Sequence, residues 1–177
     1  MEHDVQTSAT VATAIKPAGL KITPAQRQDV PQIIQLIREL AEYENLLHEV
    51  EVTENGLTDS LFGEHPAAEA LMLHWHGEPA GYAIFFHNFS TFLGRPGLFV
   101  EDIFVRPQFR RKGIARAVFI HLAGLAVQRR CGRLEWAVLD WNELGKGFYR
   151  SLGAELLPDW RIMRVTGRAL SDMAGIG

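Results

Sequence analysis

The stretch LFVEDIFVRPQFRRKGIARAVFIH, residues 98–121, decides how the chain folds. Residues 98–105 are mostly apolar and suit a buried strand, which Pro107 ends because proline cannot donate to a strand ladder. Apolar residues then recur at helical spacing from Ile114 onward, so a helix is expected to run to about Arg129. The stretch therefore predicts a strand, a basic turn that contains a glycine, and a helix.

This layout places a basic turn at the start of a helix. The first N–H groups of a helix have no partner inside it, and the helix dipole puts partial positive charge there. Gly113 and Ala115 are small enough for a phosphate to approach the backbone, and Arg110, Arg111 and Lys112 add charge. The same pattern also fits an ordinary connection with a solvated basic turn. The chain contains neither the GxxxxGK[ST] phosphate loop nor the GxGxxG dinucleotide fingerprint.

The composition limits the class of protein. A length of 177 residues, with 47% hydrophobic and 22% charged residues, predicts one soluble globular domain. The net charge of -3 argues against a nucleic-acid partner, and no apolar run is long enough to cross a membrane. The single cysteine, Cys131, excludes an internal disulfide, and the chain start lacks a signal core, so a cytoplasmic location is expected. The histidines show no metal-ligand spacing, and no metal is expected.

The rest of the chain predicts a mixed sheet covered by helices. We expect a short strand at 21–23, a helix that Asp29 caps, and a second helix that Thr53 caps. Apolar runs at 71–75 and 80–86 predict a hairpin, and a turn at 94–97 leads into the strand at 98–105. After the long helix we expect a parallel strand at 134–139, a short helix that ends at Gly153, and a last strand at 160–165. Residues 1–19 should be a flexible leader, 20–167 one domain and 168–177 a loose tail.

Two carboxylates interrupt the central apolar strand, and each needs a reason. Burying a carboxylate costs several kcal/mol unless the group is paired or used. In a regular strand Glu101 and Asp102 point to opposite faces, so we assign Glu101 to a site and Asp102 to structure. A ligand crevice is expected beyond the carboxyl ends of the parallel strands, near the basic turn, Asn142 and Tyr149.

Several motifs make the chain recognisable at this point. The stretches EDIFVRPQFRRKGIARA at 101–117 and WNELGKGFYRSLGAE at 141–155, with IRELAEYE at 37–44 and FGEHP at 62–66, resemble the GNAT superfamily of N-acetyltransferases. Within it, the chain is similar to the diamine (spermidine/spermine) acetyltransferase branch over about residues 21–165. The resemblance implies an α/β fold: one mixed sheet with helices on both faces, in which two central parallel strands splay apart around acetyl-CoA. It also implies a homodimer.

The resemblance assigns roles to individual residues. Tyr149 matches the catalytic tyrosine, which would protonate the departing thiolate of CoA, and Glu101 matches the carboxylate that faces the acceptor amine as base or binder. Strand backbone would bind the cofactor arm at Ile103, Phe104 and Val105. The pyrophosphate would be held by Arg110, Arg111, Lys112, Gly113, Ile114, Ala115 and Arg116. A second cofactor segment would be Asn142, Glu143, Leu144 and Gly145. The amine pocket would be lined by Tyr43, Glu44, Glu101, Glu135, Trp136 and, in place of another pocket carboxylate, Asp159.

The sequence thus predicts an enzyme that moves the acetyl group of acetyl-CoA to the primary amine of a small cationic acceptor: a polyamine, a diamine or a lysine-like amino acid. The amine must lose a proton before it attacks, because an ammonium with a pKa of about 10.4 has no lone pair. A backbone N–H can stabilise the oxyanion. A lone Cys131 fits direct attack in a ternary complex better than a covalent acyl-enzyme. Two alternatives remain open: a protein or aminoglycoside amine as acceptor, and a CoA-binding sensor without catalysis.

Overall fold

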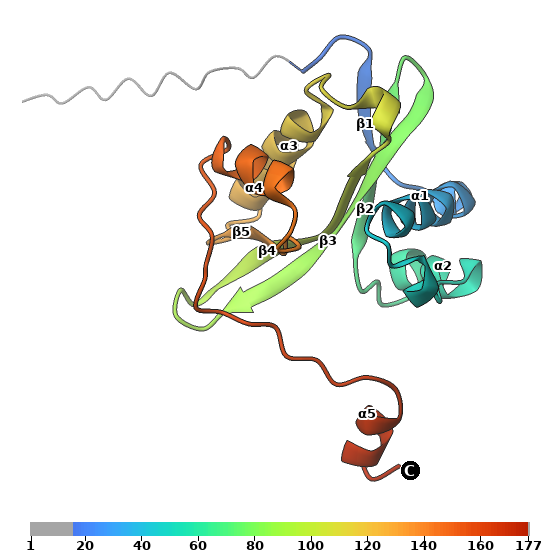
Figure 1. The fold of residues 1–177 in the computed structure, drawn as a ribbon, viewed down its shortest axis with the longest axis vertical. Helices are drawn as coiled ribbons and strands as arrows, with labels where there is room; N and C mark the ends of the chain where they lie inside the picture. Colours follow the sequence, from blue (N-terminus) through green and yellow to red (C-terminus); the bar gives the residue numbers. More distant parts are fainter. Residues whose placement is uncertain (1–15, 177) are drawn as a thin grey trace, which may run out of the picture. The chain divides into compact units, whose positions relative to one another are not determined.

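The computed structural model describes residues 16–176, and the chain divides into two compact units, Met1–Ala137 and Val138–Gly177. The first unit is built on a five-stranded sheet in the order β1-β2-β3-β4-β5 (Figure 1). Its strands are β1 Leu20–Pro24, β2 Glu69–Trp75, β3 Glu78–Ser90, β4 Arg95–Val105 and β5 Leu134–Trp136. Its helices are α1 Val30–Tyr43, α2 Glu54–Phe62 and α3 Ile114–Gln128, with short 3-10 turns at Arg27–Asp29, Leu47–Glu49 and Pro107–Phe109. Most of the leader expected at 1–19 lies outside the described residues.

The strand directions confirm the predicted mixed sheet. All neighbouring strands are antiparallel except β4 and β5, which are parallel. The β2–β3 hairpin turns at His76 and Gly77, whose positive φ angles of 49° and 89° suit a tight two-residue turn. The parallel pairing joins residues 98–100 only to β5, whereas β4 stays paired with β3 as far as Val105. Strands β4 and β5 therefore part after Val100, and the end of β4 is left with a strand neighbour on one side.

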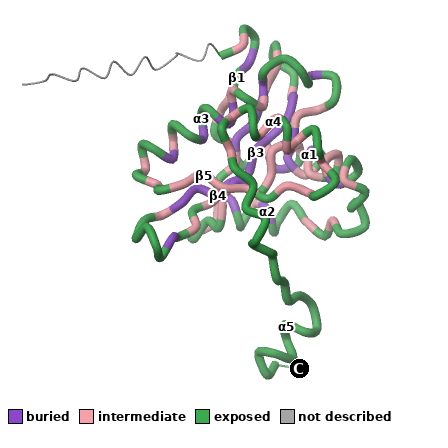
Figure 2. The backbone as a smooth tube through the Cα atoms, turned by 60° about the vertical axis from the view of Figure 1, so that its left-hand side comes forward, coloured by how far each residue is buried: buried purple, intermediate pink, exposed green. Residues whose placement is uncertain are grey.

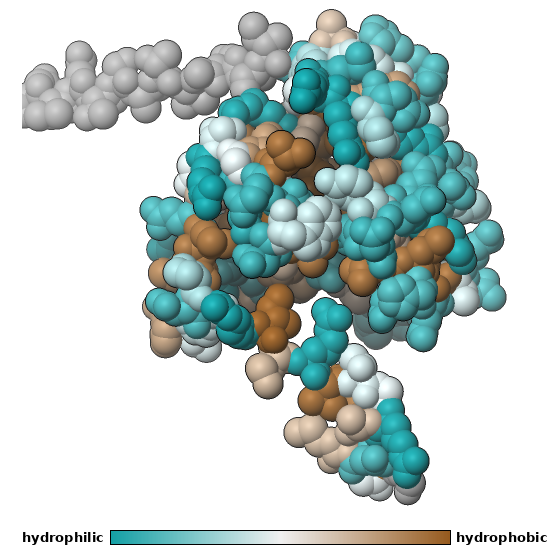
Figure 3. All heavy atoms as spheres, in the orientation of Figure 1, coloured by the Kyte–Doolittle hydropathy of each residue, from teal (hydrophilic) through white to brown (hydrophobic). Residues whose placement is uncertain are grey.

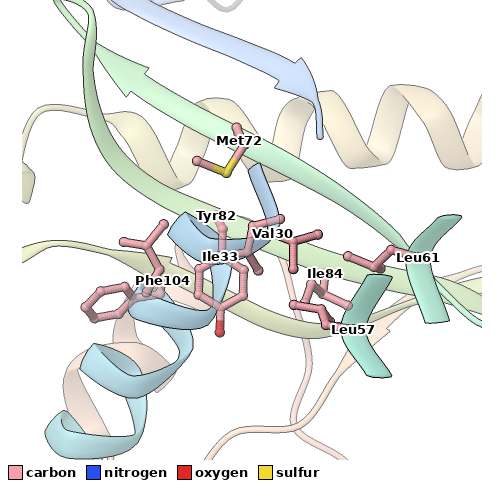
Figure 4. Packing of buried hydrophobic residues seen from close by; sticks show 9 residues of the cluster. Val30, Ile33, Leu57, Leu61, Met72, Tyr82, Ile84 and Phe104 are labelled. Atoms are coloured by element: carbon pink, nitrogen blue, oxygen red, sulfur yellow. The ribbon is translucent and has the colours of Figure 1, made fainter. Parts of the chain in front are cut away.

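Apolar side chains alternate between the two faces of this sheet. One face packs against α1 and α2 through a buried cluster (Figure 4), which comprises Val30, Ile33, Leu36, Leu57, Leu61, Met72, Tyr82, Ile84 and Phe104. The alternate strand residues Leu73 and Phe85 are equally buried on the other face, and α3 packs against β4 and β5. Buried segments accordingly follow the strands and the inner sides of these helices (Figure 2). Each Leu or Ile side chain that is fully removed from water stabilises the fold by about 1.5–3 kcal/mol. Because such side chains lie on both faces of the sheet, helices must cover both faces to bury them.

Several expected boundaries differ from the structure. Asp29 precedes α1, but its carboxylate accepts a hydrogen bond from the backbone N–H of Gln26 at 2.8 Å, so it caps the preceding 3-10 turn instead of α1. Thr53 caps α2 as predicted, with its Oγ1 accepting from the N–H of Gly56 at 3.2 Å. The turn expected at 94–97 lies at 91–94, and the strand expected at 134–139 ends at Trp136.

The second unit contains two short helices, α4 Glu143–Arg150 and α5 Gly167–Met173. Helix α4 is the predicted short helix, and Gly153 follows it with a φ of 87°, as expected of a helix-ending glycine. The strand predicted at 160–165 was wrong: these residues form no strand, because apolar alternation cannot supply the hydrogen-bonded neighbour that a strand needs. All but the first residue of α5 lies in the stretch 168–177, which was expected to be a loose tail. The single domain over 20–167 stays a prediction.

None of the helices in residues 16–176 combines the length and the apolar character that crossing a bilayer requires.

Candidate active site

A β-bulge interrupts the central strand β4 at Glu101. In the β3–β4 register Ile84 pairs with Asp102 and Phe85 pairs with Val100, so Glu101 is an extra residue without a partner. Because one inserted residue reverses the alternation of side chains, Asp102 lies on the face of its partner Ile84, which is the face packed by α1 and α2. With regular alternation from Val100, Asp102 would share the face of Val100 and its partner Phe85 instead. The expectation that Glu101 and Asp102 point to opposite faces assumed a regular strand, which the bulge contradicts, and the structural role of Asp102 stays a prediction.

Asp102 belongs to a group of acidic side chains on this face. The Tyr82 hydroxyl donates a hydrogen bond to Asp102 Oδ2 at 2.9 Å. Burial, and after it the charge of Asp102, raises the pKa of Glu44. Burial also raises the pKa of Asp102, with the nearby Glu101 adding to the shift and the Tyr82 bond opposing it. Among residues 16–176, neither Glu44 nor Asp102 forms an ion pair with a lysine or arginine.

The missing counter-charge indicates what this group of acids can bind. Two desolvated carboxylates that repel one another are costly unless a cation lies between them. The structure thus brings the predicted pocket residues Glu44 and Glu101 together and adds Asp102 and Tyr82, which the sequence analysis left out. The available signal was Tyr82 itself, since a tyrosine inside a fully apolar strand run needs a polar partner for its hydroxyl.

An ion pair positions the C-terminal end of α1 beside this group. Arg106, directly after β4, donates to both carboxylate oxygens of Glu39 in α1 at 2.7 Å, and its third bond goes to the carbonyl of Pro79 at 2.9 Å. The Arg106 hydrogen bond lowers the pKa of Glu39. Helix α1 is therefore tied to the end of β4, and Tyr43 and Glu44, which end this helix, are held near Asp102.

Arg110 folds back onto the same region. Its Nε donates to the carbonyl of Val105 at 3.0 Å, and its guanidinium lies over the rings of Tyr43 and Phe104, at 4.6 Å and 5.9 Å from their centroids. Val105 is a predicted contact of the cofactor arm, and Tyr43 is a predicted contact of the acceptor. The side chain predicted to bind pyrophosphate thus joins the two predicted subsites.

The start of α3 has the geometry expected of an anion site. Gly113 takes the N-cap position with a φ of 76°, and no side chain caps the first turn. Arg111 also has a positive φ, of 61°, and Lys112 Nζ lies 5.6 Å from the centroid of the Trp75 ring. The helix begins at Ile114 and Ala115 with backbone N–H groups directed out of its end. This uncapped, basic helix start fits the diphosphate of a coenzyme.

Two predicted pocket residues on β5, Glu135 and Trp136, contact other side chains of this chain. The Glu135 carboxylate lies 2.8 Å from Arg133 Nε and accepts from Asn88 Nδ2 at 2.8 Å. The Trp136 ring packs against Phe119 of α3, with 4.6 Å between the centroids. Glu135 is therefore a neutralised charge, unlike Glu44 and Asp102.

The predicted residues from Asn142 onward belong to the second unit. Asn142 caps α4, with its Oδ1 accepting from the N–H of Gly145 at 2.8 Å, and Glu143 pairs with Lys146 at 2.8 Å. The ring of Tyr149 lies beside that of Phe148, with 5.4 Å between the centroids. Leu144 and Asp159 are exposed. Asn142 and Gly145 thus shape the start of α4, and Tyr149 lies in its last turn.

Known proteins are similar to this chain in sequence and in fold. The model of the Acetyltransferase (GNAT) family matches residues 32–154, which include β4, the basic turn, α3 and α4. The chain is 37% identical over 169 residues to the thialysine N-epsilon-acetyltransferase of Bos taurus, covering 89% of this chain and 99% of that protein. It is 31% identical over 195 residues to the L-ornithine N5-acetyltransferase of Arabidopsis thaliana, covering 85% and 86%. An integron cassette protein from V. cholerae has the same fold, with a TM-score of 0.74, 25% identity and coverage of 88% of this chain and 98% of that one.

Proposed function

We propose that this chain, which belongs to the acetyltransferase (GNAT) family and is an N-acetyltransferase, acetylates a primary amine of a small acceptor that carries a second positive charge. The observation that carries the proposal is the pair Glu44 and Asp102, which is partly buried and forms no ion pair with a lysine or arginine among the described residues. The relatives support the size of the acceptor, since two of them are named for thialysine and ornithine. Lysine-like amino acids, diamines and polyamines all fit this chemistry.

The proposed reaction needs no covalent enzyme intermediate. The uncapped start of α3 binds the diphosphate of acetyl-CoA, and the unpaired side of β4 at Ile103 and Val105 binds its arm. Glu101 accepts the proton that the acceptor ammonium loses, directly or through water, and the amine nitrogen then attacks the thioester carbonyl. The new C–N bond forms and the C–S bond breaks, Tyr149 protonates the leaving thiolate, and the second proton that the nitrogen loses returns to the Tyr149 phenolate through water.

A panel of amines tests the acceptor class. Purified protein with acetyl-CoA is mixed with each amine, and release of the CoA thiol is followed. We expect lysine, ornithine, thialysine or a diamine to give a higher kcat/KM than a monoamine of the same length. A neutral or acidic compound as the best acceptor would contradict the proposal.

Tyr149→Phe tests the assignment of the acid. General acid catalysis contributes about 100- to 10,000-fold, so we expect kcat to fall by at least about 100-fold. CoA affinity, measured by calorimetry, should stay within about twofold, because the ring is retained. Unchanged turnover would remove Tyr149 from the mechanism.

We further propose that the chain forms a homodimer. Large apolar side chains of the second unit are exposed (Figure 3), including Trp160, Ile162 and Met163 at 73%, 75% and 92%. Apolar surface of this kind is typical of an interface. Light scattering at several protein concentrations tests the proposal, and a monomer at all concentrations would contradict it.

We also propose a cytoplasmic location, which the lone Cys131 supports. Fractionation of the source cells tests this.

A further inference from the structure

Tyr82 is a fully buried residue whose side-chain hydroxyl has one hydrogen-bond partner. Its exposed fraction is 0%, and it lies in the core cluster between α1 and the sheet (Figure 4). Phenylalanine would fill the same space without having to satisfy a hydroxyl, which is costly to bury unbonded. Here the hydroxyl donates to Asp102 Oδ2 at 2.9 Å, and this is the one hydrogen bond of that carboxylate among the described side chains. Tyr82 therefore fixes the direction in which Asp102 points.

The donor is neutral, and this distinguishes Asp102 from other carboxylates in the same unit. Glu39 and Glu69 are each neutralised by a guanidinium, from Arg106 and Arg129 respectively. A tyrosine hydroxyl supports an ionised carboxylate without cancelling its charge. Burial, with the charges of Asp102, Glu44 and Glu101, raises the pKa of Tyr82 well above its ordinary value, so this side chain stays a donor. The negative charge of Asp102 is thus kept available for a ligand.

We propose that Tyr82 is a positioning residue that, through Asp102, holds a carboxylate beside Glu44 to bind the second ammonium of a dicationic acceptor. The proposal rests on the acetyl transfer proposed above and adds the group that selects the acceptor at its non-reacting end. Glu101 then serves the reacting amine, while Asp102 and Glu44 serve the far nitrogen. Without the Tyr82 hydroxyl, Asp102 loses the hydrogen bond that orients it and supports its charge. Binding of a diamine is then weakened, whereas binding of a monoamine is unchanged.

Tyr82→Phe tests this role, because it keeps the ring and removes only the donor. A hydrogen bond to a charged group contributes about 1.5–3 kcal/mol, so KM for 1,4-diaminobutane or ornithine should rise about 10-fold or more. We expect kcat to stay within about threefold, and KM for butylamine within about twofold. The groups facing Asp102 are Tyr82 on β3, Glu101 on β4 and Glu44 at the end of α1. Loss of the bond makes Asp102 harder to ionise, so the acid limb of kcat/KM for the diamine should move to higher pH.

Asp102→Asn supplies the second arm of the experiment. Its amide oxygen can still accept the Tyr82 hydrogen bond, but its charge is gone, so KM for the diamine should rise. In this Asp102→Asn background, adding Tyr82→Phe should raise KM by less than about a further twofold. Glu69→Gln is the matched control, since it removes a carboxylate already neutralised by Arg129 and should leave KM unchanged. An equal effect of Tyr82→Phe on diamine and monoamine, or an undiminished effect in the Asp102→Asn background, would show a structural role and overturn the proposal.

Calorimetry separates this proposal from the proposed function. Diamine binding to the wild-type protein and to Tyr82→Phe is measured without acetyl-CoA, so the result does not depend on turnover. A weaker diamine affinity in the variant, with thermal melting close to wild type, supports the positioning role even if another acceptor proves to be the substrate. Equal affinities would refute it even if the wild-type enzyme acetylates diamines.

Discussion

Ala115→Glu gives opposite predictions for stability and for coenzyme binding. Ala115 is the second residue of α3, where no side chain caps the backbone N–H groups and its own side chain is half-buried. A carboxylate here lies next to the partial positive charge of the helix start. It therefore stabilises the helix, yet it repels a coenzyme diphosphate that the same partial positive charge would attract.

The magnitudes follow from the position. A negative side chain in the first turn of a helix stabilises the folded state by about 0.3–1 kcal/mol. Against a bound phosphate, a unit charge at about 4 Å costs about 4 kcal/mol near a protein surface, and solvent screening and a longer separation reduce this to about 1.4–2.8 kcal/mol. We therefore expect CoA to bind about 10- to 100-fold more weakly to the variant.

Urea unfolding measures the first effect, and calorimetry with CoA measures the second. Ala115→Gln is the matched control, since it has the same shape without the charge, so we expect Ala115→Glu to bind CoA about 10-fold or more weakly than Ala115→Gln. Ile120→Glu, on the exposed side of α3 beyond its first turn, controls for added charge on the same helix. The loss of affinity should shrink at ~0.5 M salt, where the Debye length is a few Å. A more stable Ala115→Glu variant with wild-type CoA affinity would refute an anion site at this helix start.

Three further variants test how the site is built. Arg106→Met breaks the two bonds to Glu39, and we expect a loss of about 2–3 kcal/mol in urea unfolding. Because the pKa of Glu39 is lowered in the folded state, this loss should be full above its ordinary pKa and fade as the pH falls below it. Gly113→Ala, at a φ of 76°, should cost about 1–2 kcal/mol by the same assay. Asp102→Asn should gain stability relative to wild type as the pH rises from 4 to 8, because the raised pKa of Asp102 disfavours its ionised form in the folded protein; thermal melting without ligand measures this, and no pH trend would contradict it.

The sequence predicted the elements whose signals are local. The helix α3 and the basic turn before it follow from apolar spacing and from Gly113, and Thr53 caps α2 through atoms three residues apart. The bulge at Glu101 was not predicted, because it is a property of the β3–β4 register, which a single strand's sequence does not contain. Side-chain alternation predicts a face only where the strand is regular.

Charge pairing explains the other differences in the site. Glu135 was grouped with Glu44 as a pocket carboxylate, but Arg133, two residues earlier and directly before β5, already neutralises it. That partner was visible in the sequence. The lack of an ion pair to Glu44 or Asp102 within residues 16–176 was not visible, because it depends on how α1 packs against the sheet.

In the proposed reaction, the end of β4 contacts donor and acceptor with different parts of the same residues. Its backbone is unpaired on the β5 side, while its side chains Asp102 and Phe104 face α1. Arg110 contacts both parts, through the Val105 carbonyl and the Tyr43 ring. A coenzyme arm that bonds to this strand end must share or replace the hydrogen bond from Arg110 to the Val105 carbonyl. The Arg110 guanidinium, which also lies over the Tyr43 ring, then changes its position. We therefore expect donor and acceptor to change each other's affinity by the same factor, since coupling between two bound ligands is reciprocal.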